Sequence, residues 1–122
     1  MKHEINFAEM AEIMNAIVKA EKKADEFKEM KEIKDKAHAA YVESGCSFAL
    51  ATEWSNAFQA CEKVRKSFRK VIKEAGALLF DELSYEGSEF ARYAKNCHES
   101  NIDRLLYMVR SAAVKQMRYI NL

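Results

Sequence analysis

Basic side chains gather in the middle of the chain, and their chemistry is the easiest to assign. Between Lys63 and Lys73 the sequence places six lysines and arginines, and no acid interrupts them before Glu74. Ammonium and guanidinium groups at this density neutralise phosphates or carboxylates. The segment therefore predicts contact with a nucleic acid or with an acidic protein partner.

A basic strip is predicted where this segment meets the C-terminal part of the chain. If the helices on either side of residue 86 pair in antiparallel fashion, Phe68 lies level with Arg104. The strip then consists of Arg65, Lys66, Arg69, Lys70, Lys73, Arg104 and Arg110. In the alternative, the first helix brings Asp25, Glu26, Glu29 and Glu32 to the same level, and these acids neutralise much of the strip.

The histidines and cysteines are too scattered to predict a metal site or a nucleophile. A structural zinc site uses four ligands in local pairs, whereas only Cys97 and His98 adjoin here. On a helix their side chains point about 100° apart. The sequence has no Glu-x-x-His pair and no glycine-rich phosphate loop. We therefore predict no metal, no cofactor, no catalytic residue and no enzymatic activity.

The composition predicts one helical domain over residues 1–122. The chain has no proline and only three glycines, and helix interiors tolerate neither residue well. The sequence contains no run of about 18 apolar residues, the length that a membrane-spanning helix needs, so no membrane span is predicted. The first seven residues lack the pattern of a signal peptide, and the three cysteines are odd in number and far apart. We therefore expect a cytoplasmic protein.

Hydrophobic periodicity predicts an all-α fold of three long antiparallel helices in an elongated bundle. The first covers 6–44, because Asn6 and Glu9 have capping-box spacing and Gly45 is a natural stop. It would be about 57 Å long at 1.5 Å per residue, whereas a sphere of this chain length is only about 35 Å across. We therefore expect an elongated molecule and a dimer.

The second helix is predicted over 48–83, opening at Ser47. A seam of apolar residues that includes Trp54 and Cys61 follows one face, and a second row, Phe58, Ile72 and Leu79, lies beside it. Two adjoining rows predict that this helix lies between two others. Gly76 leaves two alternatives open: a kink, which we prefer, or a helix that ends at Ala75 before a short separate one.

The third helix is predicted over 88–119, with Ser88 as its N-cap. Its apolar stripe loses phase after Cys97 and resumes at Ile102. Ser100 with Asp103 has the spacing of a new N-cap, so we expect a kink or break at residues 98–101.

Apolar residues of the first helix are the candidate protein interface. The helix is too long for a small monomer to cover, and surfaces rich in Met and Phe adapt well to partners. The candidates are Met10, Ile13, Met14, Ile17, Phe27 and Met30. The alternative is that these residues form the core.

The sequence thus favours binding without chemistry. We expect a helical interaction protein that docks on a protein partner and modulates or inhibits it. Small accessory and inhibitor proteins, including those of phages and other mobile elements, are often of this kind. The alternative is a nucleic-acid-binding protein that uses the basic strip, and a further alternative is a structural assembly subunit.

Overall fold

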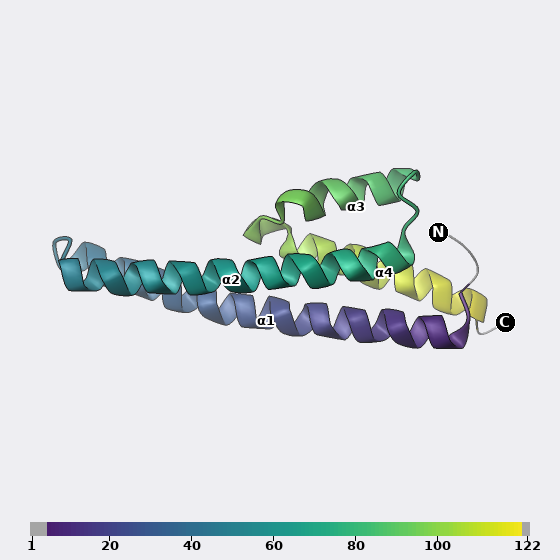
Figure 1. Ribbon diagram of the computed structural model, residues 1–122, viewed down its shortest axis with the longest axis horizontal. Helices are drawn as coiled ribbons and strands as arrows, with labels where there is room; N and C mark the ends of the chain where they lie inside the picture. Colours follow the sequence, from purple (N-terminus) through teal and green to yellow (C-terminus); the bar gives the residue numbers. More distant parts are fainter. Residues whose placement is uncertain (1–4, 121–122) are drawn as a thin grey trace. The chain divides into compact units, whose positions relative to one another are not determined.

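The computed structural model describes residues 5–120 of the chain, and the side chains of residues 5–117. Within this part every regular element is helical, which confirms the predicted all-α class. In chain order the elements are α1 (Phe7–Glu43), α2 (Phe48–Leu79), α3 (Tyr85–Asn96), the 3₁₀ turn η1 (Glu99–Asn101) and α4 (Ile102–Ile120) (Figure 1). None of the described helices is both long and apolar enough to cross a membrane.

The ends of α1 follow the predicted signals. The side-chain oxygen of Asn6 accepts a hydrogen bond from the backbone N–H of Glu9 at 2.8 Å, so Asn6 caps the helix. At the other end Gly45 adopts a φ of 71°, and the N–H of Cys46 donates to the carbonyl of Tyr41 at 3.1 Å. This left-handed turn satisfies carbonyl groups that the helix leaves open. The predicted bounds of 6–44 are correct to within a residue.

Helix α2 continues through Gly76 and ends at Leu79. The alternative that ended it at Ala75 is therefore wrong, and so is the extension to residue 83. Beyond Leu79 the chain turns at Asp81, whose carboxylate accepts from the N–H of Leu83 at 2.9 Å. That local bond offers the backbone an alternative to the helix.

The predicted third helix is two helices. Ser84, and not Ser88, is the N-cap of α3, and its hydroxyl accepts from the N–H of Gly87. The helix ends at Cys97, which has a φ of 45°. The predicted break is thus confirmed as a full interruption over residues 97–101, and Ser100 lies inside the 3₁₀ turn instead of capping α4.

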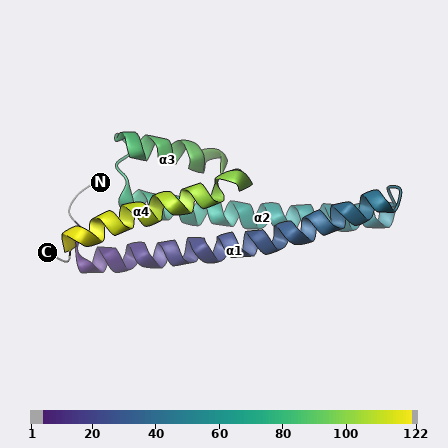
Figure 2. The same ribbon diagram turned by 180° about the vertical axis from the view of Figure 1, so that it is seen from behind.

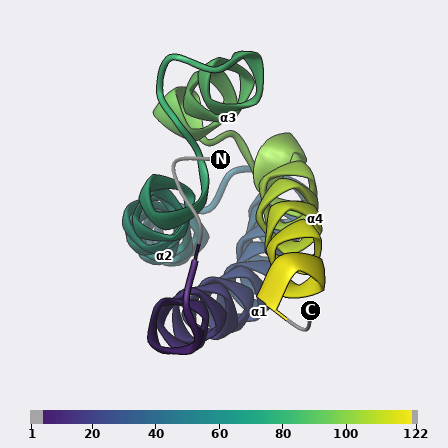
Figure 3. The same ribbon diagram turned by 90° about the vertical axis from the view of Figure 1, so that its right-hand side faces the viewer.

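The contacts between residues group the chain into two compact units. The bundle unit comprises residues up to Lys22 and from Arg69 onward, and so the first half of α1, the end of α2, α3 and α4. Viewed along the helices, α3 lies against α2 and α4, on the side away from α1 (Figure 3). The core of the bundle unit is mainly apolar, although Gln116 is also buried there. It includes the side chains of Ile13, Ile17, Ile72, Leu79, Phe90, Leu105 and Val109.

The hairpin unit comprises Lys23–Phe68. It consists of the second half of α1 and the first part of α2, which run side by side in opposite directions and are joined by residues 44–47 (Figures 1 and 2). It contains no further element, so each helix segment has one helical neighbour inside this unit.

Candidate docking surface

The turn of the hairpin unit is fixed by local hydrogen bonds. The hydroxyl of Ser44 donates to the carbonyl of Tyr41 at 2.8 Å and accepts from the N–H of Ser47 at 3.0 Å. Gly45 and Cys46 both have positive φ angles, of 71° and 69°. These bonds hold the start of α2 in a defined place directly after the end of α1.

Aromatic side chains join the two helices near this turn. The Trp54 ring lies with its centroid 4.5 Å from that of His38 and 5.3 Å from that of Tyr41. Such pairs add about 0.5–1.5 kcal/mol beyond the area that they bury. A hydrogen bond with the Cys46 thiol raises the pKa of Tyr41. The end of the hairpin is therefore an ordered surface and not a loose loop.

The hairpin unit has little core of its own. No residue between 28 and 60 is buried, whereas Ala24, Phe27, Cys61 and Phe68 are. Two helices cover only one side of each other, so apolar residues beside the seam stay in contact with water. Isolated helical segments of this kind draw most of their stability from tertiary packing, which is scarce here.

Residues 37–61, which we call the hairpin tip, expose large apolar side chains. The exposed fractions are 57% for Val42, 89% for Phe48 and 49% for Phe58. Phe58 belongs to the second apolar row of α2; Ile72 and Leu79 of that row are buried in the bundle unit. The part of this row that lies in the bundle unit is therefore packed against other residues, as a second neighbouring helix would require, while Phe58 in the hairpin unit remains half exposed.

The hairpin tip also carries few charges. Its only charged side chains are Glu43 and Glu53, whereas the preceding stretch of α1, residues 19–36, is dense with lysine, aspartate and glutamate. Depletion of charge together with exposed aromatic residues is typical of the centre of a protein interface. The combination makes the hairpin tip the candidate docking surface.

The interface residues predicted on the first helix divide by burial. Met10, Ile13 and Ile17 are buried in the bundle unit, and Phe27 is buried in the hairpin unit. The chain itself covers these four side chains. Met30 is half buried, and Met14 is 41% exposed. An interface along this seam stays a prediction, and Met14 is the member most accessible to a partner.

The arginines of the predicted basic strip have partners within their own units. Arg65 forms a two-point contact with Glu62, at 3.1 and 2.8 Å, and this hydrogen bond holds the pKa of Glu62 below its usual value. Arg69 donates to the carbonyl of Ala94 at 3.2 Å.

The two C-terminal arginines of the strip are also engaged. Arg104 donates to the hydroxyl of Tyr93 and lies over its ring, and Arg110 pairs with Glu21 at 2.6 Å. All four guanidinium groups of the strip therefore bind this chain, each satisfying a carboxylate, a carbonyl or a phenol. The pairing of Arg110 with Glu21 joins α4 to the acid-rich first helix, although the acid differs from the four considered in the sequence.

Lysines are the accessible part of the basic segment. Lys66, Lys70 and Lys73 are exposed, as is Lys63. The four follow one another at steps of three, four and three residues, which places them along one side of α2. Lys66, Lys70 and Lys73 are the exposed lysines of the predicted strip, and Lys63 extends their row beyond it.

The cysteines and histidines that the structure describes do not gather into a site. Cys61 and Cys97 are buried and Cys46 is exposed, and all three thiols are free. Within residues 5–120 no group of three or more histidine, cysteine, aspartate or glutamate side chains could hold a metal ion.

Comparison of the chain with protein-family models, with curated proteins and with solved structures gave no match.

The sequence does contain a sign of the hairpin tip, but it lies in the distribution of charge and not in the hydrophobic periodicity. Phe48 lies outside the seam of α2, and the stretch from Ala37 to Cys61 is almost uncharged. Which rows of a helix are covered depends on how many neighbours it has at each level, and the apolar pattern does not encode that number.

Proposed function

We propose that this chain is a non-enzymatic interaction protein whose hairpin tip docks on a protein partner and modulates or blocks that partner's activity. The observation that carries the proposal is the hairpin tip itself, with Val42, Phe48 and Phe58 exposed and only two acids among its residues. Exposed aromatic side chains on an ordered, charge-poor surface are what a partner buries when it binds.

The energy available from this surface suits a specific complex. Complete burial of one large apolar side chain yields about 1.5–3 kcal/mol, so three such residues supply several kcal/mol, from which the cost of association must be subtracted. The contacts of the Trp54 ring with the rings of His38 and Tyr41 keep the surface ordered, which reduces the side-chain entropy lost on binding.

The test is capture of proteins from the cells that encode the chain, with three baits. The first is the wild-type chain. The second, the tip variant, carries Val42→Ser, Phe48→Ser and Phe58→Ser. The third is a matched control that carries Phe7→Ser, Tyr85→Ser and Tyr107→Ser, because these residues are comparably exposed in the bundle unit, at 72%, 80% and 70%.

The proposal predicts a protein that binds the wild type and the matched control but not the tip variant. A protein lost from the matched control instead would move the docking surface to the bundle unit. Light scattering of the wild type distinguishes a second copy from a different protein, since a dimer that the tip variant cannot form identifies the partner as the chain itself.

A nucleic-acid-binding function is the second candidate, and the row of exposed lysines favours it. Lys63, Lys66, Lys70 and Lys73 lie along one side of α2 and form no ion pair with another described residue. The four arginines of the strip are engaged within the chain, which leaves few contacts for phosphates.

Fluorescence anisotropy with labelled duplex and single-stranded DNA and RNA tests this candidate. Four phosphate contacts would make the affinity fall steeply between about 50 and 200 mM salt. Replacement of the four lysines by glutamate would abolish binding. No binding at the lower salt concentration removes the candidate.

A further inference from the structure

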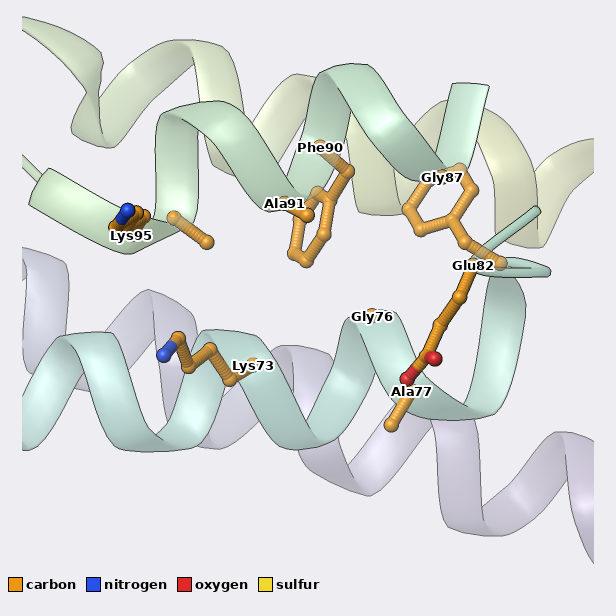
Figure 4. A pocket seen from close by; sticks show the side chains of 10 residues that line it. Lys73, Gly76, Ala77, Glu82, Gly87, Phe90, Ala91 and Lys95 are labelled. Atoms are coloured by element: carbon orange, nitrogen blue, oxygen red, sulfur yellow. The ribbon is translucent and has the colours of Figure 1, made fainter. Parts of the chain in front are cut away.

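A cleft in the bundle unit lies apart from the hairpin tip. It has a volume of about 440 Å³ and runs between the end of α2 and α3 (Figure 4). Pockets of roughly 300–1,000 Å³ hold small molecules in proteins. Its lining begins at Lys73 on α2 and continues to Phe80, directly after the end of that helix. This stretch spans about 10 Å at 1.5 Å per residue, so the cleft suits a short, extended ligand.

Small and aromatic residues form the walls. Ala77 and Ala91 face the cleft from α2 and α3, and the rings of Phe80 and Phe90 stack with centroids 4.9 Å apart. Phe90 rests on Gly76, where a Cβ would lie 2.1 Å from the ring. The Phe90 ring therefore packs directly on the backbone of α2 at Gly76 and forms an apolar wall of the cleft.

Charge is distributed unevenly along the cleft. Lys73 of α2 and Lys95 of α3 stand at one end, and Glu82 stands at the other (Figure 4). All three side chains are exposed, and neither ammonium group forms an ion pair with another described residue. Two cations on facing helices repel each other until an anion lies between them.

We propose that this cleft binds an apolar monocarboxylate of medium chain length. The carboxylate lies between Lys73 and Lys95, and the alkyl chain lies along Ala77, Ala91 and Phe90 toward Glu82. The negative charge of Glu82 disfavours a second carboxylate at the far end. The site thus selects a monocarboxylate over a dicarboxylate of the same length. This proposal does not depend on the docking function of the hairpin tip.

Amide-resolved NMR of the full chain tests the proposal with three probes of equal chain length: octanoate, octanol and octanedioate. Octanoate is expected to shift the amide signals of Ala77, Gly87 and Ala91 and to bind more tightly than either of the other two. Lys73→Met and Lys95→Met each weaken octanoate about two- to five-fold, the range expected of exposed ion pairs, and leave octanol unchanged.

Two further variants make the test specific. Glu82→Gln is expected to remove the difference between octanoate and octanedioate. Lys70→Met changes an exposed lysine of the same helix that does not line the cleft, and it should leave all three probes unaffected. All of these substitutions replace exposed side chains, so the fold is expected to survive them.

The proposal is overturned if octanoate shifts no amide of the cleft, or if the shifts lie elsewhere in the chain. It is equally overturned if the lysine variants weaken octanol as much as octanoate, or if Lys70→Met has the same effect as Lys73→Met.

Discussion

At Gly76 the backbone of α2 packs directly against the Phe90 side chain of α3, which leads to a stability prediction. A methyl group there would lie 2.1 Å from the Phe90 ring. Helix propensity alone predicts that Gly76→Ala stabilises the protein by about 1 kcal/mol. Overpacking costs typically about 1–3 kcal/mol, so we expect a net loss of up to about 2 kcal/mol in the free energy of unfolding, measured by urea denaturation.

A double mutant identifies the cause of that loss. Phe90→Leu shortens the side chain that meets the new methyl group, so Gly76→Ala should cost less in the Phe90→Leu background than in the wild type. Stabilisation by Gly76→Ala in the wild type would contradict the close packing of these two helices.

Glu62 makes the stability of the hairpin unit depend on pH. The hydrogen bond from Arg65 is the largest cause of its lowered pKa, and desolvation opposes the shift. A carboxylate with a lowered folded pKa stabilises the protein above its unfolded pKa of about 4.3 and loses that effect as the pH falls through the folded pKa. Glu62→Gln should therefore destabilise the protein near neutral pH and cease to do so in acid.

The size of this effect is small, because the carboxylate is partly exposed. We expect less than about 1 kcal/mol at neutral pH, measured as the difference in unfolding free energy between wild type and variant across the pH range. Glu53→Gln is the control, since Glu53 is an exposed acid of the same helix without an ion pair to another described residue. If the difference in unfolding free energy between the wild type and Glu62→Gln stays unchanged in strong acid, the ionised carboxylate of Glu62 is not its cause.

At the scale of the elements, the hairpin tip should be dispensable for folding. Val42, Phe48 and Phe58 are largely exposed, and surface substitutions usually change stability by less than about 0.5 kcal/mol each. The tip variant should thus unfold close to the wild type in thermal and urea denaturation. Phe68→Ala, which empties a fully buried site, should cost about 3–5 kcal/mol. A tip variant that unfolds as readily as Phe68→Ala would place these residues in the core.

The sequence predicted the helices better than their connections. Asn6 and Gly45 mark the ends of α1 because their chemistry suits only such positions. The predicted third helix starts at residue 88, whereas Gly87 already lies in the first turn of α3, where a Cβ would come within 1.9 Å of the Asp81 carbonyl. The break after α3 begins at Cys97, which has a positive φ although it lacks glycine's conformational freedom. The loss of apolar phase and the spacing of Ser100 and Asp103 indicated a break, but neither pointed to Cys97.

The candidate site was less predictable than the fold, because exposure depends on neighbours. Residues of one apolar row, Phe58 and Ile72, have the same spacing signal but opposite burial. The basic strip was predicted from charge alone, whereas its guanidinium groups find partners such as the Ala94 carbonyl and the Tyr93 hydroxyl. Neither partner is recognisable before the helices are placed.

At the scale of the whole molecule, a chain with a packed bundle unit and a sparsely packed hairpin unit separates folding from binding. The bundle unit holds most of the buried apolar side chains. The hairpin unit is consequently free to expose apolar residues that a partner can cover. The proposed docking function assigns contact with the partner to Phe48 in particular, the most exposed of the three apolar residues of the hairpin tip.

The most direct measurement is site-specific photo-cross-linking in the cells that encode the chain. A photoreactive phenylalanine analogue is placed at Phe48 in one sample and at Phe7, an exposed phenylalanine of the bundle unit, in the other. We predict one dominant adduct from position 48 and none from position 7, with the adduct mass identifying the partner as another protein or as a second copy. No adduct at position 48, or an adduct only at position 7, would contradict docking through the hairpin tip.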